Sequence, residues 1–256
     1  KLSKEYGVSH RTITNIIERN LANRNRGNKK YTVNEEYFNK IDTEDKSYWL
    51  GFLYADGYIL NKGKSFITGL TLKDLDHIEK FKSDINSTHL IKEATTVNNY
   101  SFNVYNTNFS KNLIDKGCVP RKTYKIEFPI IDKSLIRHFI RGFFDGDGSV
   151  SATDKVLQIT ICCASKKFLE KLIKKLSDET GVKNKIYKRK DGLYLYVNTS
   201  GDDILKIKNY LYKDSNKYLN RKKEIFDFIE GNIDEIKKKV WKNHWKQRKE
   251  RNTLRA

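Results

Sequence analysis

The sequence predicts an α+β fold built from two pseudo-symmetric repeats, with a small helical segment before them. The prediction depends on one pattern that occurs twice: an apolar stretch ending in Asp-Gly, then strand-like runs, an amphipathic helix, more strands and a closing helix. Each repeat is therefore expected in the order helix-strand-strand-helix-strand-strand-helix, because alternating apolar positions indicate strands and three-to-four spacing indicates helices. A chain of 256 residues, 38% of them hydrophobic, can bury a core for such a fold.

The first segment, residues 1–22, is predicted to form short helices around a turn. Gly7 can adopt the positive φ of a sharp turn, and Ser9 is a suitable N-cap for a second helix. The segment resembles the last two helices of a helix-turn-helix module, although an ordinary helical hairpin stays open. The resemblance implies that polar residues of the second helix contact DNA: His10, Arg11, Thr12 and Asn15. Because the chain starts at Lys1 and contains no Met, we expect its natural start to be missing.

The next elements follow from charge and periodicity. Residues 23–40 are polar and basic and are predicted to be a linker, with Arg24 and Arg26 expected to lie along DNA phosphates. Further boundaries are expected at 41–117 for the first repeat, 118–133 for the connection, 134–231 for the second repeat and 232–256 for a basic helix or tail. The expected strands of the first repeat are Phe66–Leu72 and Tyr100–Asn106, and those of the second are Val156–Cys163 and Leu193–Thr199. The expected helices that follow these strands are Leu75–Ile85 and 109–116 in the first repeat, and Phe168–Leu176 and 202–212 in the second.

Composition narrows the class of protein. The formal net charge of +19 favours a polyanionic partner such as nucleic acid, although a Lys-rich composition from an AT-rich genome would also give it. No apolar run approaches the roughly 20 residues of a membrane helix, and no signal-peptide pattern opens the chain. The three cysteines lack metal-binding spacing and are expected to be buried thiols. We therefore expect a soluble intracellular protein, cytoplasmic or nucleoid-associated, that is neither secreted nor bound to a membrane.

The duplicated stretches Trp49–Gly57 and Ile140–Gly148 carry the strongest functional signal. Gly51 and Ala55 share one helical face, as do Gly142 and Gly146. Two helices with such faces can approach to near-backbone distance, so we expect them to pack against each other. That packing would bring the acids at their ends, Asp56 and Asp147, side by side.

Two adjacent carboxylates are unfavourable without a cation. At ~4 Å they repel by about 4 kcal/mol for an effective dielectric constant of about 20. A hard divalent cation such as Mg²⁺ removes this repulsion and can activate water for phosphodiester hydrolysis. The alternative is that Gly57 and Gly148 are left-handed residues ending ordinary helices. Two copies at the same point of each repeat favour the functional interpretation.

Both stretches resemble the signature motifs of the LAGLIDADG homing endonuclease family, and the resemblance extends from residue 31 to about 230. It implies saddle-shaped antiparallel sheets that fill the DNA major groove, in a monomer that cuts double-stranded DNA with short 3′ overhangs. It also implies metal binding by Asp56 and Asp147, with the carbonyls of Ala55 and Gly146. The implied metal is Mg²⁺, with Mn²⁺ as a substitute and Ca²⁺ binding without supporting cleavage. Tyr54 departs from the family pattern, which often has Asp there, and indicates asymmetric halves.

The same resemblance implies basic residues that stabilise developing charge. Lys73 and Lys122 match such positions, and Lys222 is the repeat-related counterpart of Lys122. The alternative for each is a solvated surface lysine. Groove-facing strands are further expected to present Asn103, Lys188, Arg189 and Asn198 to DNA. Two other functions stay open on this scaffold, a catalytically inactive DNA-binding regulator and an RNA maturase.

Overall fold

The computed structural model describes residues 5–9, 11–16, 31–94, 98–183 and 185–253, and within them the predicted α+β fold of two αββαββα repeats is confirmed. The first repeat consists of α3 (Glu44–Ala55), β1 (Tyr58–Asn61), β2 (Phe66–Leu72), α4 (Leu75–Asp84), β3 (Ile91–Glu93), β4 (Tyr100–Val104) and α5 (Thr107–Asp115). The second consists of α6 (Ile136–Asp147), β5 (Gly148–Ala152), β6 (Leu157–Cys163), α7 (Lys166–Thr180), β7 (Ile186–Lys188), β8 (Tyr194–Asn198) and α8 (Gly201–Tyr212). Two short 3-10 turns, η1 (Lys122–Tyr124) and η2 (Lys133–Leu135), lie between the repeats, and α9 (Asn220–Thr253) follows them.

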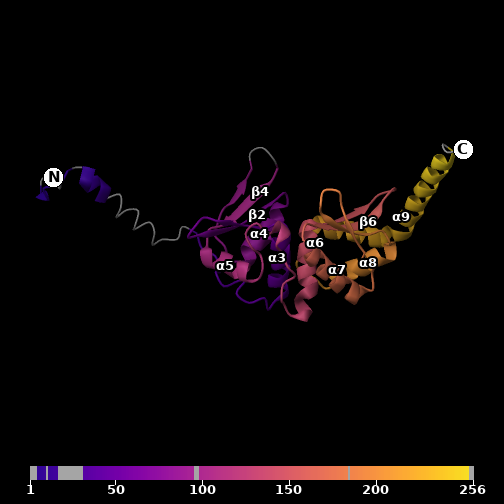
Figure 1. The fold of residues 1–256 in the computed structure, drawn as a ribbon, viewed down its shortest axis with the longest axis horizontal. Coiled ribbons are helices and arrows are strands. Elements are labelled where there is room, and N and C mark those ends of the chain that lie inside the picture. Colours follow the sequence, from indigo (N-terminus) through magenta and orange to yellow (C-terminus); the bar gives the residue numbers. More distant parts are fainter. Residues whose placement is uncertain (1–4, 10, 17–30, 95–97, 184, 254–256) are drawn as a thin grey trace.

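The two repeats lie next to each other, with α3 and α6 at their boundary (Figure 1). Each repeat holds a four-stranded antiparallel sheet, ordered β1-β2-β4-β3 in the first and β5-β6-β8-β7 in the second. In the view of Figure 1 the strands lie above helices α5, α7 and α8, so the helices cover one face of the sheets. In the part of the chain that the structure describes, no helix covers the other face of either sheet, which is called here the open face (Figure 1).

Alternation along the strands decides which residues line the core. Leu70 and Leu72 of β2 and Phe102 and Val104 of β4 are buried on the helix side. In the second repeat Leu157, Ile159 and Ile161 of β6 take the same positions. The residues between them point to the open face, as a period of two requires.

Side-chain caps fix where several helices begin. The Thr43 side chain accepts a hydrogen bond from the Lys46 N–H at the start of α3, and Asn106 accepts one from Phe109 at the start of α5. In the second repeat Ser165 and Ser200 cap α7 and α8 in the same way. Each cap satisfies an amide that has no partner within its helix.

Helix α9 confirms the helix predicted in the C-terminal tail, although it begins earlier, at Asn220. The backbone of Asn232 leaves the helical region, with φ −129° and ψ 16°, and divides α9 into two parts. Beyond this kink, Ile236 is buried and Val240 packs against the core. The tail is therefore docked on the second repeat.

The N-terminal segment agrees with the local predictions. Gly7 has a φ of +62°, and the Ser9 hydroxyl accepts a hydrogen bond from the Thr12 N–H at 3.1 Å, at the start of a helical stretch over 11–16. The helix-turn-helix itself stays a prediction. Three residues predicted to contact DNA, His10, Arg24 and Arg26, lie outside the described residues.

Two further expectations concern the chain as a whole. All three cysteines are free thiols, with Cys118 and Cys163 buried as predicted and Cys162 half-buried. Among the described helices, none combines the length and the apolar character that crossing a bilayer requires.

Candidate functional site

Helices α3 and α6 touch through their glycines, as predicted. A Cβ added to Gly51 would lie 2.0 Å from the Phe139 carbonyl oxygen, and one added to Gly142 would lie 2.0 Å from the Tyr48 carbonyl oxygen. Further along, a Cβ on Gly146 would lie 2.3 Å from the Ala55 Cβ. Neither glycine of the first pair can carry a side chain, because the obstructing atom belongs to the opposite backbone. The contact is reciprocal and fixes the two helix ends together.

Asp56 and Asp147 stand at these ends. Asp56 is the C-cap of α3, and Asp147 is the last residue of α6. A Cβ on Gly146 would lie 3.3 Å from Asp56 Oδ2, so the first acid reaches the end of the second helix. Each repeat therefore contributes one carboxylate to the same place.

The two acids affect each other's charge. Both side chains are accessible to solvent, yet the packed helix ends beneath them displace much of their hydration. This desolvation, together with the charge of Asp56, raises the pKa of Asp147 to about 6. Desolvation also raises the pKa of Asp56, while Lys222, Lys122 and Arg221 act against the rise. The site thus holds two carboxylates that resist being charged together.

The glycines after the acids do not end the helices in the left-handed conformation. Gly148 is extended, with φ −77° and ψ 157°, and Gly57 is not among the residues with positive φ. A Cβ on Gly57 would lie 2.7 Å from a Leu53 side-chain carbon, and one on Gly148 would lie 2.3 Å from Phe144. These positions are small because the chain turns closely over its own helix.

Two lysines hold the carbonyl ends of the same helices. Lys122 Nζ donates to the Ala55 carbonyl at 2.7 Å. Lys222 Nζ donates to the Phe144 carbonyl at 2.7 Å, to the Gly146 carbonyl at 3.1 Å and also to the Gly148 carbonyl. Lys222 is buried, and burial lowers its pKa to about 8. Lys222 therefore lies near the two acids, as Lys122 does, and the repeated Arg-Lys pair at 121–122 and 221–222 is the sequence signal for it.

Other charged residues surround this group. Arg221 Nε donates to Asp74 at 3.1 and 3.2 Å, and both residues act on the pKa of Asp56. Sequence reasoning did not single out either residue. Lys73, predicted at the site, lies exposed directly after β2, beside Asp74 in the chain.

The sixth position of the second motif, Asp145, is buried and fully bonded. Its carboxylate accepts hydrogen bonds from the Tyr48 hydroxyl at 2.8 Å, from the Leu219 N–H at 2.8 Å and from the Tyr212 hydroxyl. Burial raises the pKa of Asp145, and these three donors act against the rise. The bond to Leu219 holds the chain three residues before Lys222.

The first motif has Tyr54 at the same position. Its hydroxyl donates to the Lys116 carbonyl at 2.6 Å, on the segment that leads to Lys122. The Tyr54 ring packs edge-to-face on Phe139 of α6, with ring centroids 5.1 Å apart. Tyr54 therefore has the same structural role as Asp145, because each holds the segment that precedes a lysine near the acids. Tyr54 donates its hydrogen bond to that segment, whereas Asp145 accepts one from it.

The open faces of the sheets carry small polar side chains. On the first sheet the Tyr58 ring lies over Gly69, where a Cβ would be 2.2 Å from it, and its hydroxyl donates to Asn103 Oδ1 at 2.8 Å. Asn103 also donates to Ser101 Oγ at 3.1 Å. The corresponding residues of the second sheet alternate with the core and were not singled out from the sequence: Ser149, Ser151, Gln158 and Thr160. Their alternation with the apolar residues Val150, Leu157 and Ile159, which are buried, is the signal that could have found them.

The structure places one predicted DNA contact differently. Asn198 lies on the core side of β8, buried, and its carboxamide bonds Asp203 Oδ2 at 3.0 Å and the Ser200 N–H at 2.9 Å. Its polar atoms are used in the turn into α8, so it does not face the open side. Lys188 and Arg189 are exposed at the end of β7, with Arg189 paired to Asp191 at 2.9 Å. Arg11, Thr12 and Asn15 are also exposed.

The donor set at the helix ends fits a hard cation. Two carboxylates that disfavour joint ionisation gain from a divalent ion, and Mg²⁺ usually takes one or two carboxylates, waters and substrate phosphates. Within the described ranges no group of three or more His, Cys, Asp or Glu side chains is placed so that it could hold a metal ion. The carbonyls of Ala55 and Gly146 each accept a hydrogen bond from a lysine, and their part in binding metal stays a prediction.

Comparison with known proteins matches both halves to related domains. Residues 134–212 match the model of a LAGLIDADG-like domain, and residues 45–110 match the model of the WhiA LAGLIDADG-like domain. No curated protein matches the chain.

Solved structures show the same fold. The I-SmaMI LAGLIDADG homing endonuclease bound to cleaved DNA aligns with a TM-score of 0.53 and 16% identity, over 80% of this chain and 95% of the other. Meganuclease I-SmaMI bound to uncleaveable DNA gives 0.52 and 16%, over 77% and 93%. LAGLIDADG meganuclease I-AabMI bound to uncleaved DNA gives 0.51 and 15%, over 75% and 96%. At these identities the likeness concerns the fold.

Proposed function

The chain belongs to the LAGLIDADG family, and from this premise we propose that it is a site-specific homing endonuclease that cuts both strands of a DNA duplex with the help of a divalent metal ion. The observation that carries the proposal is the meeting of Asp56 and Asp147. One acid comes from each repeat, and a contact that excludes any side chain at Gly51 or Gly142 holds them together. A protein that only binds DNA gains nothing from this repulsive pair.

Each part of the site has a role in this function. The open sheet faces, with Tyr58 and Asn103 on the first, bind the duplex and read base edges. Asp56 and Asp147 would hold Mg²⁺, which supplies activation of water and stabilisation of the leaving oxygen when bound. Lys122 and Lys222 place positive charge beside the reacting phosphate, where negative charge develops. One acid per repeat suits one cut per strand, and short 3′ overhangs are expected.

The test begins with the acids. Asp56→Asn and Asp147→Asn are each expected to abolish double-strand cleavage while changing duplex affinity by less than about tenfold, since the sheets are untouched. Cleavage is measured with Mg²⁺ on a library of DNA duplexes, and affinity is measured without metal. Asp178→Asn, on exposed α7 and paired with Lys174 at 2.9 Å, is the control and should cut normally. Retained cutting by either site variant would refute the proposal.

A second candidate is a DNA-binding regulator that no longer cuts. It is favoured by the match of residues 45–110 to a different LAGLIDADG-like model and by the Gly7 turn followed by the Ser9-capped helix. Sequence-specific binding of a duplex by the unmodified protein with no cleavage in Mg²⁺ or Mn²⁺ would support it. Binding of structured RNA in preference to any duplex would instead support an RNA maturase.

A further inference from the structure

The part of α9 beyond the kink forms a separate feature, called here the C-terminal arm and defined as residues 233–247. One face of the arm is fixed to the second repeat. Ile236 is buried, Asn243 Nδ2 donates to the Asp154 carbonyl at 2.7 Å, and Lys237 pairs with Asp202 at 2.6 Å. Lys239 pairs with Asp154 at 3.6 Å. Ile236, Lys239 and Asn243 are three and four residues apart and share one side of the helix, and Lys237 adds a contact beside them, so the four residues together set the position of the arm.

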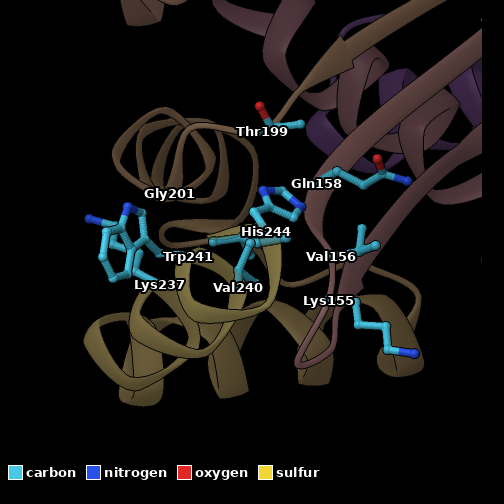
Figure 2. A pocket seen from close by; sticks show the side chains of 10 residues that line it. Lys155, Val156, Gln158, Thr199, Gly201, Lys237, Val240, Trp241 and His244 are labelled. Atoms are coloured by element: carbon cyan, nitrogen blue, oxygen red, sulfur yellow. The ribbon is translucent and has the colours of Figure 1, made fainter. Parts of the chain in front are cut away.

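The arm borders the open face of the second sheet. Figure 2 shows Val240, Trp241 and His244 of the arm on one side of a cavity of about 370 Å³, with Gln158 on the opposite side. Gln158 is one of the open-face residues of β6. In Figure 1 the end of α9 rises from the second repeat on the side of the strands, away from α7 and α8. A duplex lying along the sheets would therefore continue past the arm.

The outward side of the arm carries closely spaced positive charges. Lys238, Lys242 and Lys246 are spaced by four and all are exposed. Lys238 acts electrostatically on Glu235, one turn before it, whereas no ion pair of Lys242 or Lys246 is found among the described residues. Residues 236–247 contain no Asp or Glu. Helix α7 differs, because its Lys166 and Lys174 pair with acids one turn away at 3.3 and 2.9 Å. Like charges at this spacing slightly destabilise a helix, so a surface of this kind gains from a polyanion.

Two aromatic side chains flank the lysines. Trp241 and Trp245 are 67% and 49% exposed and stack with ring centroids 5.9 Å apart. Exposed tryptophans of this kind are enriched at binding surfaces, because the flat ring contributes contact area with little loss of conformational entropy. Their position beside a lysine stripe favours a sugar–phosphate backbone over an apolar protein surface.

We propose that the C-terminal arm is a second DNA-contact surface, which grips the phosphate backbone of duplex that extends beyond the second sheet. This inference rests on the proposed function, in that the sheets must seat the duplex next to the arm. Lys238, Lys242 and Lys246 make the phosphate contacts, and the tryptophan pair packs beside them. The arm adds affinity without sequence information, as contacts to phosphate do.

The main experiment compares two triple variants that remove the same charge. In one, Lys238, Lys242 and Lys246 are changed to Gln. In the control, Lys167, Lys171 and Lys175 are changed to Gln, since they are exposed at the same spacing on α7, beneath the sheet. Affinity for a random-sequence duplex of about four turns is measured at several salt concentrations, without divalent metal. The arm variant should lower the slope of log K against log salt by about 2 to 3, and the control should change it little.

Tryptophan quenching gives an independent measurement. The chain has three tryptophans, and Trp49 is fully buried, so acrylamide quenching reports mainly on the arm. Adding the duplex to the unmodified protein should protect Trp241 and Trp245 from quenching. Equal salt slopes for the two triple variants, or unchanged quenching with bound duplex, would overturn the proposal. So would an effect of the arm variant on an RNA hairpin that is absent with duplex DNA.

These outcomes separate the inference from the proposed function. If no duplex is ever cut but the arm variant still weakens duplex binding, the proposed nuclease function is wrong and the proposed DNA contact by the arm is supported. If the protein cuts normally and the arm variant behaves like the α7 control, only the proposed DNA contact by the arm is wrong.

Discussion

The two repeats share a backbone plan but hold their site lysines differently. In the second, Asp145 accepts three hydrogen bonds, one of them from the Leu219 N–H. In the first, Tyr54 makes a single bond to the Lys116 carbonyl. Both contacts hold the segment before a lysine, so the same motif position can keep its structural role although the direction of its hydrogen bond is reversed.

The lysines themselves show the consequence. Lys222 lies in the first turn of α9, is buried and bonds three carbonyls. Lys122 lies in the short turn η1, is half-buried and bonds one. Arg121 before it has a φ of +54°, a left-handed conformation that is unusual for a residue with a side chain. The second lysine is therefore held more rigidly than the first.

The largest expected difference lies in these lysines. Lys222→Met should slow cleavage by about 10²- to 10³-fold, because a fixed cation in a poorly hydrated site stabilises developing charge most strongly. Lys122→Met should slow it by about tenfold to 10²-fold, since its charge is better hydrated. Single-turnover cleavage at saturating metal measures both. Lys223→Met, which removes a lysine paired with Asp227 on the same turn, is the control. Equal losses of cleavage rate for Lys122→Met and Lys222→Met would contradict the proposed difference between the two lysines.

A smaller difference is expected at the sixth motif position. Asp145→Asn should lower the free energy of unfolding by about 2 to 3 kcal/mol, because an amide cannot accept from all three buried donors. Tyr54→Phe loses one hydrogen bond and should lower it by about 1 kcal/mol. Urea unfolding followed by circular dichroism gives both values. If Tyr54→Phe lowers the free energy of unfolding as much as Asp145→Asn does, the hydrogen bonds around Asp145 contribute no more to stability than the single bond of Tyr54.

The mildest effect is on pH dependence. The raised pKa of Asp147, about 6, means that its ionised carboxylate, the form proposed to bind metal, is present above that pH and is lost below it. The lowered pKa of Lys222, about 8, means that its charge is present below that pH and is lost above it. The cleavage rate should therefore have a bell-shaped dependence on pH, with limbs near pH 6 and pH 8. Outside these limbs the rate should fall by about tenfold per pH unit.

Two changes sharpen this comparison. Excess Mg²⁺ should move the acid limb to lower pH, because the cation competes with the proton. Lys222→Arg should remove the alkaline limb, since a guanidinium stays protonated. Survival of the alkaline limb in that variant would assign it to another group.

Much of the site followed from the sequence, because its signals are local and repeated. The glycine faces of 51 and 142 and the acids that follow them sit at fixed spacings, and their meeting is confirmed. The partners of Asp145 come from α3, α8 and the start of α9, so no local pattern could reveal them. Asn198 was misplaced because strand spacing alone does not give the phase of alternation. The roles assigned to the lysines and acids stay predictions.

The reciprocal contact of Gly51 and Gly142 has a consequence for how such a molecule can change. Each repeat contributes a glycine and, three residues before it, a carbonyl oxygen that the other repeat's glycine faces. The two sides of the contact are therefore equivalent in shape. A foreign repeat with the same motif could replace one half and keep the acids in register, while losing the one-sided bond from Tyr48 to Asp145. If the proposed function holds, the architecture separates the sheet surfaces that would select a target from the helix contact that would keep the acids together, so the sheets could be exchanged without rebuilding that contact.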